Sequence, residues 1–220
     1  VQEQVQRSVY WWNKVATYAQ RKPSPLNGFD LFNYMALIVC ARARDYAEIT
    51  FHKFADELEA KDAAGQYAFG APENEKHRVT WEGIAVWTYL GATFKGLKNQ
   101  GAVMTGSAYP GLWSLVYTPG DLESMAEAYT NVYINTCGPN RYEEFYKVVK
   151  NSKSDGIVLH LNRSCKLMGL LNNEGAEYVN AKMGVPYVSF DGDQTDPRVF
   201  TPAQYETRVQ ALTEMMDENQ

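Results

Sequence analysis

The first part of the chain repeats apolar positions at the spacing of an α-helix. Val5, Val9, Trp12 and Val15 recur three or four residues apart among polar side chains, which predicts an amphipathic helix at the N-terminus. The stretch RKPSPLNG, residues 21–28, contains two prolines and a glycine and interrupts that pattern. We therefore expect a helix followed by a turn.

Two more helices are expected after this turn. Asp30 is predicted to cap a second helix running through Leu31 to Ala43, because a carboxylate can accept hydrogen bonds from the free N–H groups at a helix start. A third helix is expected to reach the small residues AAG at 63–65. The polar stretch GAPENEK at 70–76 is then expected to form a hinge.

Beyond the hinge, short β-rich runs alternate with amphipathic helical stretches, which is typical of a parallel sheet covered on both faces. The expected strands span 78–82, 102–106, 156–161 and 185–190, and the expected helices span 84–99, 121–135, 139–151, 166–183 and 202–217. This order predicts an α/β fold: a doubly wound, mostly parallel four-stranded sheet of the Rossmann or flavodoxin-like type, preceded by a helical segment. We divide the chain into that helical segment, 1–76, which we expect to link to a missing N-terminal domain, and an α/β domain, 77–220.

Several expected boundaries have a stereochemical signature. Asp121 follows Pro-Gly as an N-cap, Gly184 ends a helix, and TPAQ at 201–204 is a capping box with proline at the first helical position. In sheets of this type, ligands bind beyond the carboxyl ends of the strands. The motifs NRSCK and DGDQTDPR are both expected at that edge.

Composition excludes two kinds of partner. The net charge of −5 and the pI near 5.3 give no electrostatic basis for binding nucleic acid. The longest purely apolar run, residues 35–41, is far shorter than the roughly 20 residues that a membrane helix needs. We expect neither nucleic acid nor a membrane among the partners.

The chain starts without Met and without the layout of a signal peptide, so we expect it to be part of a longer protein. Its three cysteines, Cys40, Cys137 and Cys165, are odd in number and far apart in sequence, which fits neither a disulfide framework nor a zinc site. A reducing cytoplasm is the expected compartment.

Cys165 is the leading candidate for chemistry. It is expected between the end of a strand and the start of a helix, where free N–H groups and the helix dipole favour a thiolate, and Arg163 and Lys166 add positive charge. A thiolate can act as a nucleophile or as a ligand of iron or zinc. A small buried hydrophobe is an equally weighted alternative.

The acidic motif after the last strand begins like a calcium loop. Asp191 and Asp193 have suitable spacing, but Asp196 occupies the position where such a loop needs glycine, and we reject a calcium site. We favour Asx-type turns over a magnesium or ligand role. For Arg198 we favour an ion pair within the loop over binding of an anionic ligand.

The remaining candidates have mostly structural interpretations. His160 is expected to be a hydrogen-bonded core histidine, Cys40 to be packed, and Cys137 to lie exposed at a turn without chemistry. Tyr109 and Trp113 are expected in a loop at the same sheet edge as Cys165, where they can wall a pocket. Neither G-x-G-x-x-G nor G-x-x-x-x-G-K-[ST] occurs, so nucleotide-binding roles lose their main support.

The motifs DGIVLHLNRSCK, GVPYVSFDGDQTDPRVF and AQYETRVQALTEMM, with HRVTWEGIAVW, DLESMAEAY and NRYEEFYKVVK before them, resemble the C-terminal region of the larger-type subunit of 2-hydroxyacyl-CoA dehydratases. That family also includes ATP-dependent benzoyl-CoA reductases, and the resemblance covers residues 77–220. It implies a heterodimer in which each subunit holds a [4Fe-4S] cluster through three cysteines. Cys165 matches the third ligand.

The resemblance also implies the reaction. A separate ATP-hydrolysing activator injects one electron, the acyl-CoA thioester becomes a ketyl radical anion, and the 2-hydroxyl group is expelled; in the reductases, electrons enter an aromatic ring. The residues expected around the cluster or the substrate are Arg163, Ser164, Lys166, Tyr109, Trp113, Asp191, Asp193 and Arg198.

The sequence departs from the family pattern in two ways. The domain that carries the other two cysteine ligands is missing, so we expect this chain alone to lack the cluster and to be inactive. LMGLLNNEG also follows Cys-Lys where a Gly-Gln-Tyr-Asp-like run is common in dehydratase subunits, which keeps a reductase subunit as an alternative. Two alternatives of other kinds stay open: an enzyme with Cys165 as nucleophile, and a non-catalytic assembly or ligand-binding module.

Overall fold

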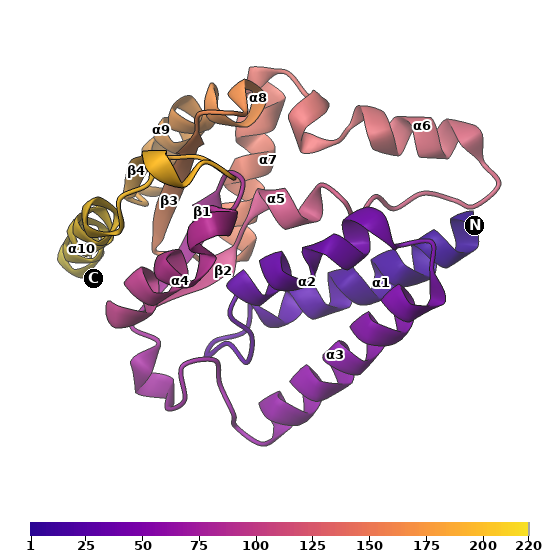
Figure 1. Ribbon diagram of the computed structural model, residues 1–220, viewed down its shortest axis with the longest axis horizontal. Helices are drawn as coiled ribbons and strands as arrows, with labels where there is room; N and C mark the ends of the chain where they lie inside the picture. Colours follow the sequence, from indigo (N-terminus) through magenta and orange to yellow (C-terminus); the bar gives the residue numbers. More distant parts are fainter. Residues whose placement is uncertain (220) are drawn as a thin grey trace.

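The computed structural model describes residues 1–219 and begins with three helices. They are α1 (Gln2–Tyr18), α2 (Phe29–Cys40) and α3 (Asp45–Ala63). These helices lie together beside the sheet, and the two chain ends are at opposite ends of the molecule (Figure 1). The predicted N-terminal helical segment is confirmed.

The start of α2 differs from the prediction. The helix begins at Phe29, one residue before Asp30, and the side chain of Asn27 accepts the Phe29 N–H at 3.1 Å. The N–H of Gly28 donates to the carbonyl of Met104 at 2.8 Å, and a Cβ at Gly28 would lie 2.7 Å from that same oxygen. Asp30 is therefore a first-turn residue, and the helix start is fixed by its contact with a strand.

Four parallel strands form one sheet. They are β1 (His77–Glu82), β2 (Ala102–Gly106), β3 (Gly156–Asn162) and β4 (Tyr187–Gly192), in the spatial order β2-β1-β3-β4. The predicted doubly wound α/β fold is confirmed, and every pairing in the sheet is parallel.

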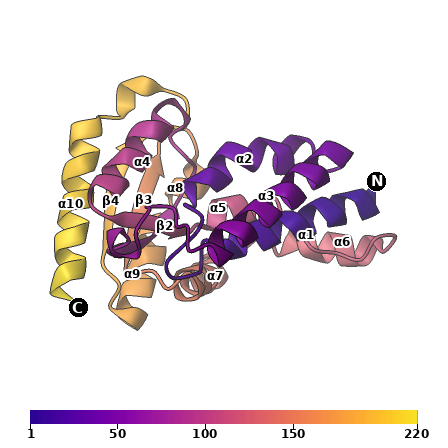
Figure 2. The same ribbon diagram turned by 90° about the horizontal axis from the view of Figure 1, so that it is seen from below.

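Helices cover both faces of the sheet. The longer ones after the first strand are α4 (Leu90–Asn99), α6 (Leu122–Thr130), α7 (Gly138–Asn151), α9 (Asn172–Met183) and α10 (Pro202–Glu218). The short elements are η1 (Pro72–Asn74), η2 (Trp87–Tyr89), α5 (Ala108–Gly111), η3 (Tyr133–Asn135), α8 (Lys166–Gly169) and η4 (Pro197–Val199). The pair α4 and α10 packs on one face and the pair α7 and α9 on the other (Figure 2).

Two expected helices are shorter in the structure. The predicted helix 84–99 begins only at η2, because Ile84, Ala85 and Val86 form a buried loop in which the carbonyl of Ile84 bonds with His160 on β3. The predicted helix 121–135 ends at Thr130, after which the Asn135 side chain caps the carbonyl of Tyr129 at 2.8 Å.

The predicted helix 166–183 is split into α8 and α9. The guanidinium of Arg141 donates to the carbonyls of Leu167 and Met168, which an uninterrupted helix would use for its own N–H groups. Hydrogen bonding from another helix thus ends α8 after one turn.

The predicted caps have mixed outcomes. Asp121 caps α6 by accepting the Ser124 N–H at 3.0 Å, and Gly184 ends α9 with a φ of 71°, so both predictions are confirmed. The prediction of a capping box at Thr201 is wrong, because within residues 1–219 the Thr201 side chain accepts no capping hydrogen bond. Pro202 has no N–H, so the first turn of α10 has one free donor fewer to satisfy.

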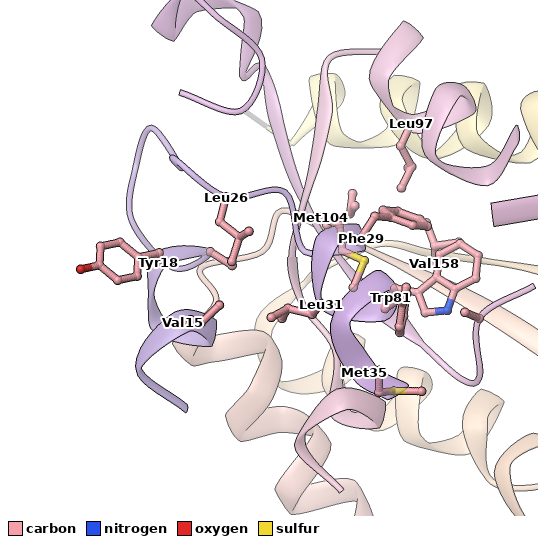
Figure 3. Packing of buried hydrophobic residues seen from close by; sticks show 14 of the residues in the cluster. Val15, Tyr18, Leu26, Phe29, Leu31, Met35, Trp81, Leu97, Met104 and Val158 are labelled. Carbon is pink, nitrogen blue, oxygen red and sulfur yellow. The ribbon is translucent and has the colours of Figure 1, made fainter. Parts of the chain in front are cut away.

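One hydrophobic cluster joins the helical segment to the sheet. It runs from Trp12 and Phe51 through Phe32 to Trp81 and Leu212. Figure 3 shows where α2 meets the strands within this cluster. A second cluster, centred on Phe145, fills the space between α7, α9 and β3. The division into two domains at residue 76 stays a prediction.

Candidate functional site

The strand order reverses direction between β1 and β3. From β1 the chain moves outward to β2, and from β3 it moves outward to β4 on the other side. In open parallel sheets, ligands bind at such a reversal of strand order, beyond the carboxyl ends of the strands. Glu82 ends β1, and the Cys165 turn follows β3, so both lie at this position.

Cys165 lies immediately before α8 and its side chain is partly exposed. It packs against an apolar cluster of Ile84, Leu112 and Met168. Tyr109 and Trp113 pack against the same cluster, and their rings meet edge to face at 6.3 Å. Burial, and to a smaller extent the charge of Cys165, raise the pKa of Tyr109. The structure thus brings together the thiol and the two aromatic residues that the sequence placed at one sheet edge.

The other residues of the Cys165 turn point mainly to solvent. Arg163 and Lys166 are exposed, and the Nε of Arg163 lies 3.8 Å from a carboxylate oxygen of the equally exposed Asp191. The hydroxyl of Ser164 donates to the carboxylate of Asp193. This bond connects the turn to the loop after β4.

The acidic loop is built from Asx turns, as predicted. Oδ1 of Asp193 accepts the N–H groups of Thr195 and Asp196, both at 2.9 Å. These bonds and the Ser164 hydroxyl hold the pKa of Asp193 well below its usual range. Asp196 pairs with Arg198, whose NH2 lies 2.6 Å from Oδ2, which confirms the favoured ion pair within the loop.

A buried polar pair lies beneath the Cys165 turn. The carboxyl group of Glu82 is inaccessible to solvent, and its Oε1 accepts the Tyr133 hydroxyl at 2.8 Å. Burial raises the pKa of Glu82 to about 7, although Tyr133 and the nearby charge of Arg141 act in the opposite direction. Among residues 1–219, the second oxygen of Glu82 has no hydrogen-bond partner.

Arg141 connects this pair to the turn. It is 1% exposed, its guanidinium carbon lies 4.7 Å from the centre of the Tyr133 ring, and it donates to Leu167 and Met168 at 2.7 and 3.2 Å. It also donates to Oδ1 of Asn172 at 3.3 Å. One buried cation therefore contacts the residues on both sides of the break between α8 and α9.

His160 is a core residue, as predicted. Its Nδ1 bonds with the carbonyl of Ile84, and its ring stacks on Phe190 with centroids 5.1 Å apart. Burial lowers the pKa of His160. In the described part of the chain, no hydrogen bond links His160 to Cys165, so the hypothesis of a nucleophile with His160 as base gains no support.

The outcomes for the other two cysteines differ. Cys137 is exposed just before α7, as predicted. The prediction that Cys40 is packed is wrong, because its side chain is exposed at the end of α2. The buried face of α2 includes Met35 and Ile38, and a residue two positions beyond Ile38 falls on the opposite side of a helix.

Cys165 is the candidate metal ligand among the described residues. Cys165 provides a partly exposed thiol, but residues 1–219 contain no group of three His, Cys, Asp or Glu side chains that could hold a metal ion. A cubane cluster is normally held by several thiolates. The thiol fits the role of one ligand, and this part of the chain does not form a complete site.

Glu82, Tyr133, Arg141 and Asn172 were absent from the residues that the sequence indicated. Each lies in a different element, and hydrophobic periodicity carries no information about contacts between distant segments. The motif RVTWE did contain a signal, because a glutamate at the end of an expected central strand must be buried and therefore partnered.

The fold and the site define a parallel α/β protein with a thiol at the carboxyl edge of its sheet. The chain belongs to the family described as 2-hydroxyglutaryl-CoA dehydratase, D-component, whose profile matches residues 1–216. The family resemblance found in the sequence is confirmed.

Three relatives illustrate the range of similarity. Lactoyl-CoA dehydratase subunit alpha of Anaerotignum propionicum is 62% identical over 100% of this chain and 52% of its own length. The (R)-2-hydroxyisocaproyl-CoA dehydratase alpha subunit of Clostridioides difficile is 43% identical over 94% of this chain and 50% of its own. A benzoyl-CoA reductase subunit of Thauera aromatica is 23% identical over 91% of this chain and 49% of its own. The chain thus spans about half the length of these relatives.

Across residues 1–219, none of the helices combines the length and the apolar character that crossing a membrane requires.

Proposed function

We propose that this chain is part of the alpha-type subunit of a 2-hydroxyacyl-CoA dehydratase, and that the substrate is lactoyl-CoA. The observation that carries the proposal is the 62% identity to a lactoyl-CoA dehydratase subunit along the whole chain. Identity to the alpha subunits that act on larger acyl groups is lower, at 43% for 2-hydroxyisocaproyl-CoA and 39% for phenyllactyl-CoA.

The proposed reaction removes water from the 2-hydroxyacyl thioester, which turns lactoyl-CoA into acryloyl-CoA. The hydrogen lost from C3 is not acidic enough for ordinary base catalysis, so the proposal includes a ketyl radical of the thioester, formed with one electron from an ATP-dependent activator. The proposed partners are therefore a second dehydratase subunit and this activator.

Cys165 is proposed as one ligand of a [4Fe-4S] cluster. When bound, such a cluster supplies single-electron chemistry at low potential. The position of the thiol at the reversal of strand order supports this role, as does its partial exposure above an apolar cluster. The other cysteine ligands are proposed to come from a part of the protein beyond these 220 residues.

The neighbouring side chains are proposed to shape the environment of cluster and substrate. Tyr109 and Trp113 form an apolar wall beside the thiol, which excludes water from a reactive radical. Arg163 and Lys166 are exposed cations on the turn itself and are suited to the anionic CoA thioester. Asp193 holds the turn through Ser164.

The test is an assay of the complete subunit with its partner and activator, without oxygen, on lactoyl-CoA and benzoyl-CoA. We expect formation of acryloyl-CoA that depends on ATP, and no reduction of benzoyl-CoA. The second candidate is a benzoyl-CoA reductase subunit, which is favoured by the 23% identity to such a subunit. Ring reduction without dehydration would support this candidate. Turnover of neither thioester would favour a non-catalytic assembly module.

A further inference from the structure

The Cys165 turn has little internal support of its own. It leads into α8, which is a single turn of four residues. Two backbone bonds close this turn, from the N–H of Gly169 to Cys165 at 3.0 Å and from the N–H of Leu170 to Lys166 at 2.9 Å. A one-turn helix is only marginally stable in water, so its conformation has to be fixed from outside.

Asp193 fixes the residues before Cys165 by accepting the Ser164 hydroxyl, and Arg141 fixes the residues after it. The Arg141 side chain comes from α7, and its two terminal nitrogens donate to the carbonyls of Leu167 and Met168 and to the side chain of Asn172. A guanidinium can make these bonds at once because its donors are arranged in a rigid planar fork, which an ammonium group lacks.

The surroundings of Arg141 explain why it keeps one orientation. The side chain is 1% exposed and lies over the ring of Tyr133, whose hydroxyl is in turn held by Glu82. Burial makes every misplacement costly, since a buried charge without partners is strongly destabilising. The orientation of the guanidinium and that of the turn are thus coupled.

We infer that Arg141 is a positioning residue for Cys165: it fixes the turn that holds the thiol against the apolar cluster at the carboxyl edge of β1 and β3. This inference rests on the proposed function in one respect: the role of the positioning is to hold Cys165 in place as a cluster ligand. The geometry itself is independent of that function and can be tested without a cluster.

The test measures how fast each cysteine reacts with a thiol reagent in the complete subunit, purified without iron. Arg141→Lys keeps a cation but loses the fork, and we expect it to raise the labelling rate of Cys165 about tenfold by allowing local opening. Cys40 is exposed at the end of α2, far in sequence from Arg141, and serves as the internal reference, whose rate should stay unchanged. Hydrogen exchange at Gly169 and Leu170 should rise in parallel.

Arg78→Lys is the matched control. Arg78 is also 1% exposed and also donates to backbone carbonyls, those of Ala19, Arg21 and Ser152. It additionally pairs with the buried carboxylate of Glu75, which a lysine can still do, and it lies near the other end of β1. Arg78→Lys should destabilise the protein to a similar extent and leave the labelling rate of Cys165 unchanged. If Arg141→Lys does not fold, Asn172→Leu removes a single acceptor and should raise Cys165 labelling about threefold.

Equal labelling of Cys165 in wild type and in the Arg141 or Asn172 variants would overturn the inference. An equal rise with Arg78→Lys would also overturn it, because the effect would then be general destabilisation. Failure of the proposed function gives a different result: Cys165→Ala would leave the iron content of the complete subunit unchanged, while the labelling rate of Cys165 in the wild-type background would still depend on Arg141.

Discussion

The hydroxyl of Tyr133 donates a 2.8 Å hydrogen bond to Oε1 of Glu82, a carboxyl group that solvent does not reach. The two residues are 51 positions apart in the sequence. Their contact connects the end of the central strand β1 to the segment before α7, and the burial of the carboxyl group, against the effect of this bond, raises its pKa to about 7.

The first prediction concerns this titration. Burial raises the pKa of Glu82 from 4.5 to about 7, so the folded protein retains a proton that the unfolded chain releases. The contribution of the protonated Glu82 carboxyl to the free energy of unfolding is fully present below pH 4.5 and is lost as the pH rises through 7. Glu82→Gln can still accept the Tyr133 hydroxyl but cannot ionise.

We therefore expect the Gln variant to match wild type at pH 4.5 and to be more stable by about 3 kcal/mol at pH 8, at about 1.4 kcal/mol per pKa unit. Urea unfolding at both pH values measures this difference. If the two proteins differ in stability by the same amount at both pH values, Glu82 titrates near its usual pKa, which would contradict the burial of its carboxyl group.

The second prediction concerns Gly83, which has a φ of 107° and would place a Cβ 2.6 Å from the carbonyl oxygen of His160. Gly83→Ala should reduce the free energy of unfolding by about 3 kcal/mol. The alanine would be strained at this positive φ, and its Cβ would push the residue after β1 away from the backbone of β3. Gly91→Ala is the control, since nothing lies within 4 Å of its added Cβ in the helix α4. It should be neutral or slightly stabilising, and equal losses in both variants would refute the account of Gly83.

The third prediction concerns the loop after β4. Asp193→Asn should cost about 2 kcal/mol, because Oδ1 can still accept the Thr195 and Asp196 N–H groups, but an NH2 group replaces the oxygen that accepts the Ser164 hydroxyl, and the charge is lost. The pKa of Asp193 is lowered, so this advantage of wild type is fully present above pH 3.8, is smaller at pH 3, and is lost completely only as the pH falls through the lower pKa of the folded state. Thermal unfolding at pH 7 and pH 3 provides the measurement. Asp191→Asn is the exposed control and should have almost no effect.

The sequence predicted the sheet because each strand is encoded locally. Runs such as GIVLHL at 156–161 are apolar enough to identify strands buried on both faces. The Asx turns at Asp193 and the pair of Asp196 with Arg198 were also predictable, because their partners lie within three residues. Contacts between residues that are close in the sequence can be predicted without a structure.

The contacts around the thiol depend on distant segments. Arg141 is 26 residues from Leu167 and 31 from Asn172, and its bonds end α8 where periodicity predicted a continuous helix. The late start of α4 has a similar cause, since the carbonyl of Ile84 bonds with His160 on the neighbouring strand. Tertiary contacts overrode local helix preference at both places.

The most direct test of the account is the iron content of the complete subunit, purified without oxygen together with its partner. We predict that Cys165→Ala sharply reduces iron binding in this subunit, while Cys137→Ala, at an exposed turn before α7, leaves it unchanged. Full iron content in the Cys165 variant would contradict the assignment of this thiol as a cluster ligand.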